Sequence, residues 1–554
     1  MSTYRPAGLR LPLLLAAAAI TGCLGALATH GFRLLLDGMS RWLFGEAGGP
    51  VQVAGGLPPE LRVLTPVIGG IVAGWLLQRL PPARQHSADY MESIALGNGH
   101  LSWRATLLRA ASSASSIVSG SSIGREGSMI QLAALAGSLS GQLARLTAPQ
   151  RRLLLACGAA AGVSAAYNTP IAGALFVGEI IVRSVAIETL GPLLLAAACA
   201  QLVGAGLFGD AAIYQLPSLA LHGGTDWLWF GALGVVAGLV MPGFQRLLQL
   251  SKSLFGRLPC PLWLKLGIGG AIVGGLSLLT PHVWGNGYST IDHMLHSAWP
   301  VGLLLGVLIC KILATAAATG SGAVGGIFTP TLFVGAVLGA IFGHAVQALT
   351  GQPAGPLWVV AGMGALLAGA TQAPLMTIIM LIEMTRAPLM AVPLMLAVAT
   401  AHLTVRMLGC RSIYAHALPD EENVRQSVLD VMYKDTPQLS YPVSLRQLAD
   451  TFATWRWQHV YITHPRQGFM GAVPIHDFHH FQRQESDPDR PIPDALIRRD
   501  FPRVSAGMSL SESLELMIAH HGERLPVVGD DGRLLGHLRK SDLLKRLGSR
   551  WRYL

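Results

Sequence analysis

Long apolar segments, many of them interrupted by glycine, proline or serine, recur from residue 11 to residue 408 of this chain. The clear segments are residues 11–36, 61–80, 153–180, 189–208, 228–249, 263–280, 300–319, 330–349, 357–384 and 388–408. A helix needs about 20 apolar residues to cross a bilayer, and irregular backbone at membrane depth is tolerated only where it is buried in protein or lines a cavity. The pattern therefore predicts an all-α polytopic membrane domain with broken helices, which is typical of transporters and channels.

The composition favours a membrane protein and argues against a nucleic-acid partner. Charged residues make up 13% of the chain and the mean hydropathy is +0.47, whereas about a quarter of the residues in soluble domains are charged. The net charge is +10, but no basic stripe is interleaved with aromatic residues. Because Lys and Arg favour the cytoplasmic side of a membrane, we interpret the basic excess as a sign of topology.

The six cysteines stand alone, without disulfide or metal-ligand spacing, so we predict neither disulfides nor a bound metal. At the N-terminus, Arg5 and Arg10 precede an apolar run in which Cys23 follows a lipoprotein-like Ile-Thr-Gly sequence. A cleaved signal peptide is one interpretation of this run. Because the run continues as one long helix to Leu36, we expect it to be retained.

The two halves of the apolar region share a pattern. Residues 170–179 and residues 374–383 each begin with proline, continue as an apolar helix and end with glutamate. A glycine-rich interruption precedes each helix, at residues 120–128 and 320–330. Such a repeat indicates a transporter architecture whose binding site lies where the two interruptions meet, near the bilayer midplane.

The C-terminal part is polar and contains a repeat of its own. Residues 471–477 match residues 536–542, and in each copy the aspartate lies six positions after the glycine. In the second copy, residues 525–528 and 534–538 have the pattern of two strands joined by a tight turn. We predict a membrane domain over residues 1–418 and a soluble α/β pair over residues 419–554, with units at about 426–484 and 491–550.

The first interruption, residues 119–128, is rich in glycine and serine and leads into an apolar helix. Backbone of this kind leaves N–H groups pointing outward, and a helix N-terminus adds unpaired donors and a partial positive charge of about half a unit. Residues 325–330 open a second helix in the same way, with Pro330 in the first turn, where no donor is lost. Two such N-termini at one point predict a site for a small dehydrated anion.

Glu126 is unexpected at this site, because a carboxylate should be repelled from an anion site. An ionisable residue in a membrane segment is a functional candidate by default. One hypothesis is a gate, in which the charged carboxylate occupies the N–H donors and swings away when it is protonated. The alternative is a structural ion pair with Arg125.

Four motifs in series resemble the CLC family of chloride channels and chloride/proton antiporters: residues 124–127 (Gly-Arg-Glu-Gly), 168–179 (Asn-Thr-Pro leading to glutamate), 325–330 (Gly-Gly-Ile-Phe-Thr-Pro) and 412–414 (Ser-Ile-Tyr). The C-terminal part resembles a CBS domain pair. The resemblance implies a CLC-type inverted repeat, transport of chloride or a similar anion, and a homodimer with one pore in each subunit. It also implies a multi-pass protein of the bacterial inner membrane with the CBS pair in the cytoplasm.

The resemblance implies roles for individual residues of these motifs. Glu126 matches the gating glutamate. The backbone amides of Ile327 and Phe328 and the hydroxyl of Tyr414 match anion-coordinating groups, and a phenol O–H can donate to an anion. For Tyr414 the alternative is a tyrosine of the membrane interface. The loops that place these groups contain Gly124, Arg125, Gly127, Gly325 and Gly326.

Two departures from the family pattern concern the anion site. Where the family usually has Gly-Ser-Gly-Ile-Pro, residues 86–90 are His-Ser-Ala-Asp-Tyr. The resemblance still implies Ser87 as an anion ligand, but the glycines and the proline are gone and Asp89 adds a negative charge, which leaves the halide selectivity open. Ser128 replaces a proline at a helix start, which is a milder change.

A third departure concerns proton coupling. Proton-coupled members of the family commonly have a second glutamate immediately after the position of Glu179, and here that residue is Ile180. Isoleucine cannot carry a proton, so we hypothesise a gated, passive chloride channel. The alternative is a chloride/proton antiporter in which Glu179 or a chain of water molecules replaces the missing relay.

The CBS pair adds a candidate nucleotide site. In CBS modules an aspartate after serine or threonine often binds the ribose of an adenine nucleotide, and Ser541 and Asp542 fit this pattern. His476 and Asp477 in the first copy fit it less well. A purely structural module is the alternative, and we expect no other cofactor.

Two other classes of membrane protein can carry a CBS pair. A site-2 type protease needs His-Glu-x-x-His on a helix to hold zinc, and His344, His402 and His416 all lack a partner at that spacing. A metal-ion transporter needs several intramembrane carboxylates, whereas helix N-termini repel cations. We therefore predict a transport protein and not an enzyme.

Overall fold

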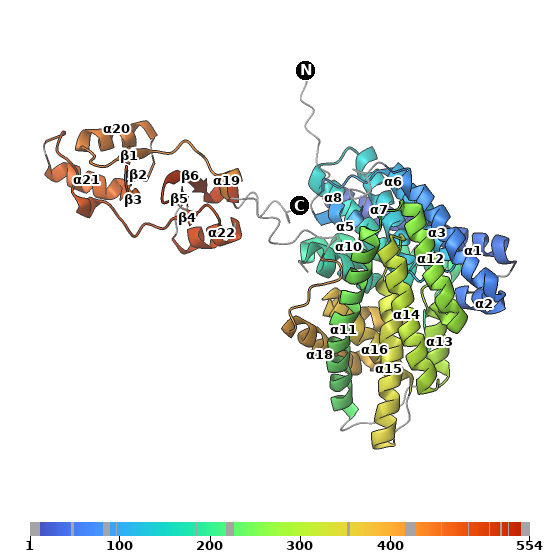
Figure 1. Ribbon diagram of the computed structural model, residues 1–554. Coiled ribbons are helices and arrows are strands. Elements are labelled where there is room, and N and C mark those ends of the chain that lie inside the picture. The colour runs from blue at the N-terminus through green and yellow to red at the C-terminus, as the bar shows by residue number, and fades with distance from the viewer. Residues whose placement is uncertain are drawn as a thin grey trace. The chain divides into compact units, whose positions relative to one another are not determined.

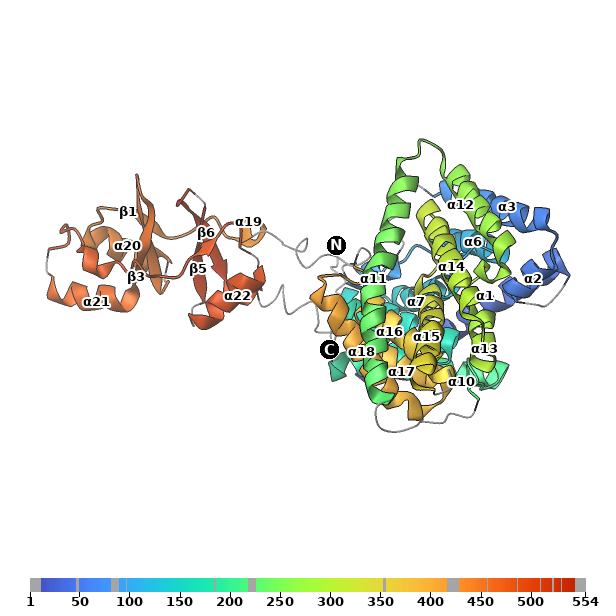
Figure 2. The same cartoon turned by 60° about the horizontal axis from the view of Figure 1, so that its bottom comes forward.

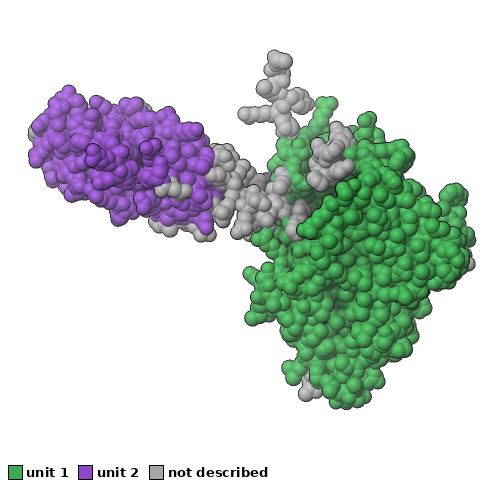
Figure 3. Space-filling model, in the orientation of Figure 1, with its two compact units in different colours: residues 1–418, 553–554 green, residues 419–552 purple. Residues whose placement is uncertain are grey.

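The computed structural model describes residues 11–45, 49–80, 89–95, 97–183, 186–217, 226–351, 355–415, 428–455, 457–485, 487–508, 510–520, 523–529 and 531–543. The chain forms two compact units, which Figure 3 shows in different colours. Unit 1 contains residues 1–418 and is built from helices, and unit 2 contains residues 419–552 and holds two three-stranded sheets.

The helices of unit 1 fall into two successive sets (Figure 1). The first set is α1 (Leu11–Phe44), α2 (Pro50–Gly56), α3 (Pro59–Gln78), α5 (Tyr90–Ala95), α6 (Trp103–Val118), α7 (Glu126–Leu143), α8 (Ala148–Tyr167), α9 (Pro170–Leu175), the π-helix η1 (Phe176–Val182) and α10 (Ile187–Phe208). The second set is α11 (Asp226–Arg257), α12 (Leu262–Leu279), η2 (Pro281–Val283), α13 (Tyr288–His296), α14 (Val301–Ser321), α15 (Phe328–Thr350), α16 (Pro356–Thr371), α17 (Pro374–Thr385), η3 (Pro388–Met390) and α18 (Ala391–Met407).

Eight of the described helices are long and apolar enough to cross a membrane, namely α1, α3, α10, α11, α12, α14, α15 and α18. Large apolar side chains on these helices face outward; Leu202 on α10 is 73% exposed and Leu239 on α11 is 58% exposed. Such a surface is unfavourable in water and suits contact with lipid tails. The predicted multi-pass membrane domain is confirmed.

The order of elements repeats between the two sets, with α7, α8 and α9 corresponding to α15, α16 and α17. The helices α8 and α16 both end at a residue with left-handed backbone, Asn168 (φ 54°) and Gln372 (φ 59°). A helix that begins with proline follows two residues later in both sets. The repeat predicted from the sequence is therefore present in the fold.

Glycines hold each broken helix against the next helix of its own set. A Cβ atom at Gly137 of α7 would lie 2.1 Å from the carbonyl oxygen of Leu154 in α8. A Cβ atom at Gly335 of α15 would lie 2.4 Å from the carbonyl oxygen of Gly362 in α16. Only glycine permits two backbones to approach this closely, and this packing fixes where α7 and α15 begin.

Unit 2 contains two sheets with the same construction (Figure 2). In each sheet the first strand is parallel to the second, the second is antiparallel to the third, and the register shifts near the end of the central strand. The predicted pair of similar α/β units is confirmed. The elements are α19 (Val428–Val431), β1 (Gln438–Ser440), α20 (Leu445–Trp455), β2 (His459–His464), β3 (Gly468–Pro474), α21 (Ile475–Gln484), η4 (Asp494–Leu496), β4 (Val504–Ser505), α22 (Leu510–Ala519), β5 (Arg524–Val528) and β6 (Leu534–Arg539).

Candidate functional site

The two glycine-rich interruptions meet in unit 1. The N–H of Gly124 donates to the carbonyl of Gly326 at 2.7 Å, and the N–H of Gly326 donates to the carbonyl of Gly124 at 2.8 Å. The helix α7 begins two residues after Gly124, and α15 begins two residues after Gly326. This short antiparallel bridge therefore joins the N-termini of the two broken helices, as the repeat predicted.

The other two glycines of the predicted loops are required for this close approach. A Cβ atom at Gly127 would lie 3.1 Å from the amide nitrogen of Gly326, and one at Gly325 would lie 2.6 Å from the side chain of Ile123. A larger residue at either position would push the two interruptions apart. Gly127 thus allows two backbones to touch, and Gly325 leaves room for the side chain of Ile123.

Backbone donors at the start of α15 are unused among the described residues. Among the described residues, the amides of Ile327 and Phe328 donate no hydrogen bond to another protein group. They lie in the first turn of α15, where the helix contributes a partial positive charge. Unpaired amides at a helix N-terminus are suited to binding an anion, so the geometry supports the role predicted for Ile327 and Phe328.

Glu126 lies at the first position of α7 and is only 2% exposed. Its Oε1 accepts a hydrogen bond of 2.9 Å from Nδ2 of Asn286, and its Oε2 is buried with no hydrogen-bond partner among the described residues. Within the described part of the chain, Glu126 forms no ion pair with Arg125. The guanidinium of Arg125 instead lies 5.8 Å from the ring centre of Tyr288. The structural alternative of an Arg125–Glu126 pair is therefore not what holds this carboxylate.

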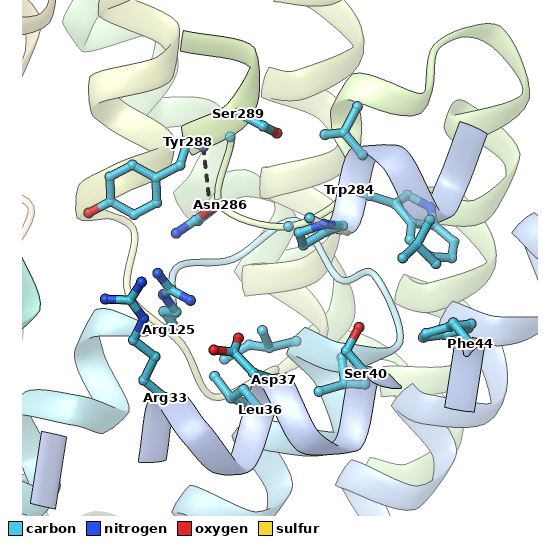
Figure 4. Close-up of a pocket in the computed structure, with 18 of the residues that line it drawn as sticks. Arg33, Leu36, Asp37, Ser40, Phe44, Arg125, Trp284, Asn286, Tyr288 and Ser289 are labelled. Atoms are coloured by element: carbon cyan, nitrogen blue, oxygen red, sulfur yellow. Dashed lines mark hydrogen bonds between the residues drawn. The ribbon is translucent and has the colours of Figure 1, made fainter. Parts of the chain in front are cut away.

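A cavity of about 350 Å³ lies beside the junction (Figure 4). Arg125, Asn286 and Tyr288 line one part of it, and Arg33 and Asp37 of α1 line another. The guanidinium groups of Arg33, Arg41 and Arg125 and the carboxylate of Asp37 thus line the space next to the loop that carries Glu126. The cavity gives a small anion a positively charged approach to that loop.

Aromatic rings connect Tyr414 to the N-terminus of α15. The ring centres of Tyr414 and Phe176 are 6.2 Å apart, those of Phe176 and Phe328 are 6.4 Å apart, and those of Phe328 and Tyr167 are 5.4 Å apart. The hydroxyl of Tyr167 hydrogen-bonds that of Thr329 at 3.2 Å. Tyr414 therefore packs in the same aromatic cluster as Phe328, whose amide is unused. Sequence reasoning did not select Tyr167 or Phe176, although both lie within or beside the Asn-Thr-Pro motif.

The junction has the form expected of an anion-transport protein, and comparison with known sequences decides the family. Residues 69–406, more than half of the chain, match the family model described as voltage gated chloride channel. The chain belongs to the CLC family. Residues 494–549 match the model of the CBS domain.

Known CLC proteins are similar over most of their own length. A putative chloride channel protein ClcB-like of Ralstonia nicotianae is 47% identical over 415 residues, which are 73% of this chain and 96% of the relative. The voltage-gated ClC-type chloride channel ClcB of Escherichia coli is 39% identical over 411 residues, which are 72% of this chain and 96% of the relative. Among solved structures, a slow cyanobacterial Cl⁻/H⁺ antiporter has a TM-score of 0.66 and 27% identity, covering 74% of this chain and 97% of its own.

Ile180, which the resemblance matches to a proton-relay position, lies in apolar surroundings. Ile180 lies in η1, is 4% exposed, and belongs to the hydrophobic core together with its neighbours Ile181 and Val182. The carboxylate of Glu179 accepts hydrogen bonds from the backbone N–H groups of Leu375 (3.2 Å) and Met376 (2.7 Å). Glu179 therefore caps the N-terminus of α17.

A glutamate of the second half makes the equivalent contact with the first half. The carboxylate of Glu383 in α17 accepts hydrogen bonds from the N–H groups of Ile171 (3.0 Å) and Ala172 (2.9 Å) at the start of α9. The sequence showed the equal proline-to-glutamate spacing but gave no sign that each glutamate caps the helix of the other half. Only the three-dimensional arrangement reveals this exchange.

The first anion loop of the family is only partly visible. Ser87 lies outside the described residues. Asp89 is described, and its Oδ1 accepts a hydrogen bond of 2.9 Å from the N–H of Met91. The negative charge expected beside the anion site is thus engaged at the start of α5.

The candidate nucleotide site in unit 2 contains an internal contact. The hydroxyl of Tyr433 donates to Oδ2 of Asp542 at 2.9 Å, and its ring stacks on His537 at 5.3 Å. Burial, with Arg539 and Arg524 nearby, lowers the pKa of His537 to about 4, so this histidine is neutral at physiological pH.

The other members of the predicted CBS sites lie in different settings. Ser541 is exposed. In the first copy, Asp477 pairs with Arg498 at 2.8 Å, and His476 is exposed beside it. Asp542 is thus held by a tyrosine hydroxyl, whereas Asp477 is held by an ion pair.

Proposed function

We propose that this CLC protein is a gated, passive pathway for chloride. A chloride ion is held by the amides of Ile327 and Phe328, with the Tyr414 hydroxyl and the Ser87 hydroxyl as further ligands, and Glu126 opens and closes the path. The observation that carries the proposal is the bridge between Gly124 and Gly326. It brings two helix N-termini together and leaves the amides of Ile327 and Phe328 without a partner among the described residues.

The apolar side chain at position 180 supports a channel over an antiporter. Ile180 is buried in apolar surroundings and carries no proton, and the carboxylate of Glu179 is engaged by two backbone amides. The names of the relatives that are 47% and 39% identical describe channels, whereas the antiporter structure is 27% identical.

Proton coupling is tested with the purified protein in liposomes. With an outward chloride gradient and a pH-sensitive dye inside, we expect chloride efflux without movement of protons against their gradient. Proton uptake that is driven by the chloride gradient would establish the antiporter and end the channel proposal. An ionophore that carries chloride passively provides the reference for uncoupled flux.

We also propose that the protein is a homodimer of the bacterial inner membrane with unit 2 in the cytoplasm. The half-buried carboxylates of Glu179 and Glu383 lie beside exposed apolar side chains, of which Ile171 is 49% and Leu375 is 54% exposed. A charged group facing lipid is costly, so a second subunit is the favourable cover for this surface. The last turn of α18, which precedes unit 2, contains a basic residue, which is typical of cytoplasmic helix ends.

For unit 2 we propose an adenine nucleotide at Ser541 and Asp542. The carboxylate of Asp542 is already an acceptor for the hydroxyl of Tyr433, and a ribose hydroxyl would offer the same kind of donor. Calorimetric titration of the full-length protein should show heat with ATP, ADP or AMP in the wild type and none in Asp542→Ala. A titration without heat for all three nucleotides contradicts the proposal.

A further inference from the structure

Asn286 is outside every motif of the sequence, yet its side chain is the hydrogen-bond partner of the candidate gate. Its Nδ2 donates to Oε1 of Glu126 at 2.9 Å. The N–H of Tyr288 donates to Oδ1 of Asn286 at 3.4 Å, which Figure 4 marks with a dashed line. Because an amide has one accepting oxygen and one donating nitrogen, this second bond fixes the NH₂ group toward Glu126.

The loop that carries Asn286 is held on several sides. Gly287 has left-handed backbone (φ 96°), and a Cβ atom there would lie 2.3 Å from the ring of Phe333. Trp284 is fully buried, with its ring only 2.3 Å from where a Cβ atom of Gly120 would lie. The loop thus has little freedom to shift, and Asn286 presents its amide at a fixed place.

A buried lysine supports the loop from the other side. Lys311 of α14 is fully buried, and its ammonium group donates to the carbonyls of Val283 (3.1 Å) and Gly285 (2.7 Å). It lies 5.0 Å from the ring centre of Phe333, and no carboxylate of the described residues forms an ion pair with it. A buried amino group is costly unless it finds acceptors, so two carbonyls of one loop form a firm attachment.

Two sets of donors can therefore compete for the ionised gate. One set is the pair of unused amides at Ile327 and Phe328, and the other is the side chain of Asn286. In the structure the carboxylate of Glu126 is bound to Asn286 while the amides carry no partner from the described chain. Hydrogen bonds to a charged carboxylate are about twice as strong as neutral ones, so the choice between the two sets depends on the ionised state.

Resting on the proposed gating role of Glu126, we propose that Asn286 is a docking residue for the gate. It binds the ionised carboxylate of Glu126 and keeps it away from the amides that receive the anion. At neutral pH the pathway then conducts during the time that the carboxylate of Glu126 is bound to Asn286 and not to those amides. A positioning role of this kind predicts that the loss of Asn286 changes the pH profile of transport more than its maximum rate.

The test uses chloride efflux from liposomes that contain full-length Asn286→Ala. Without the docking donor, ionised Glu126 moves to the amides, so efflux at about pH 7.5 should fall at least about threefold, while efflux at about pH 4.5 should stay within about twofold of the wild type. Asn286→Asp, which adds a like charge, should give a larger fall in the same direction. Asn98→Ala, which replaces an exposed asparagine outside this cavity, should keep the wild-type profile. An Asn286→Ala protein with an unchanged pH profile overturns the proposal.

A double variant separates this inference from the gate itself. If Asn286 acts through Glu126, Asn286→Ala should have no further effect on efflux in a Glu126→Gln background. An equal loss in both backgrounds shows a structural role for Asn286 and overturns the inference while leaving the gate intact. If Glu126→Gln alone keeps the wild-type pH dependence, the gate proposal fails first.

Discussion

Replacing Glu126 with glutamine should abolish the pH dependence of chloride efflux. Glutamine keeps the shape and the oxygen that accepts from Asn286, but it cannot ionise and so cannot compete with an anion for helix N-terminal amides. Efflux of the variant at about pH 7.5 should match that at about pH 4.5 within about twofold, whereas efflux of the wild type should rise as the pH falls. The measurement is chloride efflux from liposomes over this pH range.

Glu92 provides the matched control for this experiment, because it is an exposed glutamate in α5. Glu92→Gln should keep both the rate and the pH dependence of the wild type. A Glu126→Gln protein that still responds to pH as the wild type does would show that another group is the gate.

Removing either Glu179 or Glu383, each of which caps a helix of the other half, should destabilise the membrane unit substantially. Glu179→Ala and Glu383→Ala each lose two hydrogen bonds between a carboxylate and the N–H groups of a helix start. Hydrogen bonds to charged groups contribute about 1.5–3 kcal/mol each, so each variant should lose roughly 3 kcal/mol of stability. The apparent melting temperature of the purified protein in detergent checks this loss, and light scattering on the same samples tests whether two chains stay together.

The stability losses of the Glu179 and Glu383 variants can be compared with each other. Because the two glutamates make equivalent contacts, the two variants should lose similar amounts of stability, and Glu92→Ala should change it by less than about 0.5 kcal/mol. A melting temperature equal to that of the wild type in either variant would mean that these carboxylates contribute little. A light-scattering mass of one chain in the wild type would contradict the homodimer.

Much of the fold could be predicted because short sequence patterns determine the spanning helices and their interruptions in a membrane protein. The apolar lengths predicted the spanning helices, and the glycine-rich interruptions predicted where backbone donors would be left free. The proline-to-glutamate spacing predicted two related halves, and residues 471–477 and 536–542 predicted the paired sheets of unit 2. Each of these signals is a short pattern with a single physical cause, so no long-range information was needed.

The surroundings of the gate could not be predicted in the same way. Asn286 and Lys311 are 160 and 185 residues away from Glu126 along the chain, and neither lies in a recurring pattern. Their roles depend on how the loop before α13 packs against Phe333 and Trp284. For the same reason, the sequence did not show that Glu179 and Glu383 each cap a helix of the other half, since spacing along the chain does not indicate which helix a carboxylate reaches. Side-chain partners across more than a hundred residues emerge only from the packed structure.

The central claim is that the paired N-termini of α7 and α15 hold a halide ion. Anomalous diffraction from crystals of the protein grown in bromide tests it directly. We expect a bromide peak within about 3.5 Å of the amide nitrogens of Ile327 and Phe328. An electron-density map with no halide at this place, or with a metal cation between the two helix ends, would contradict the account.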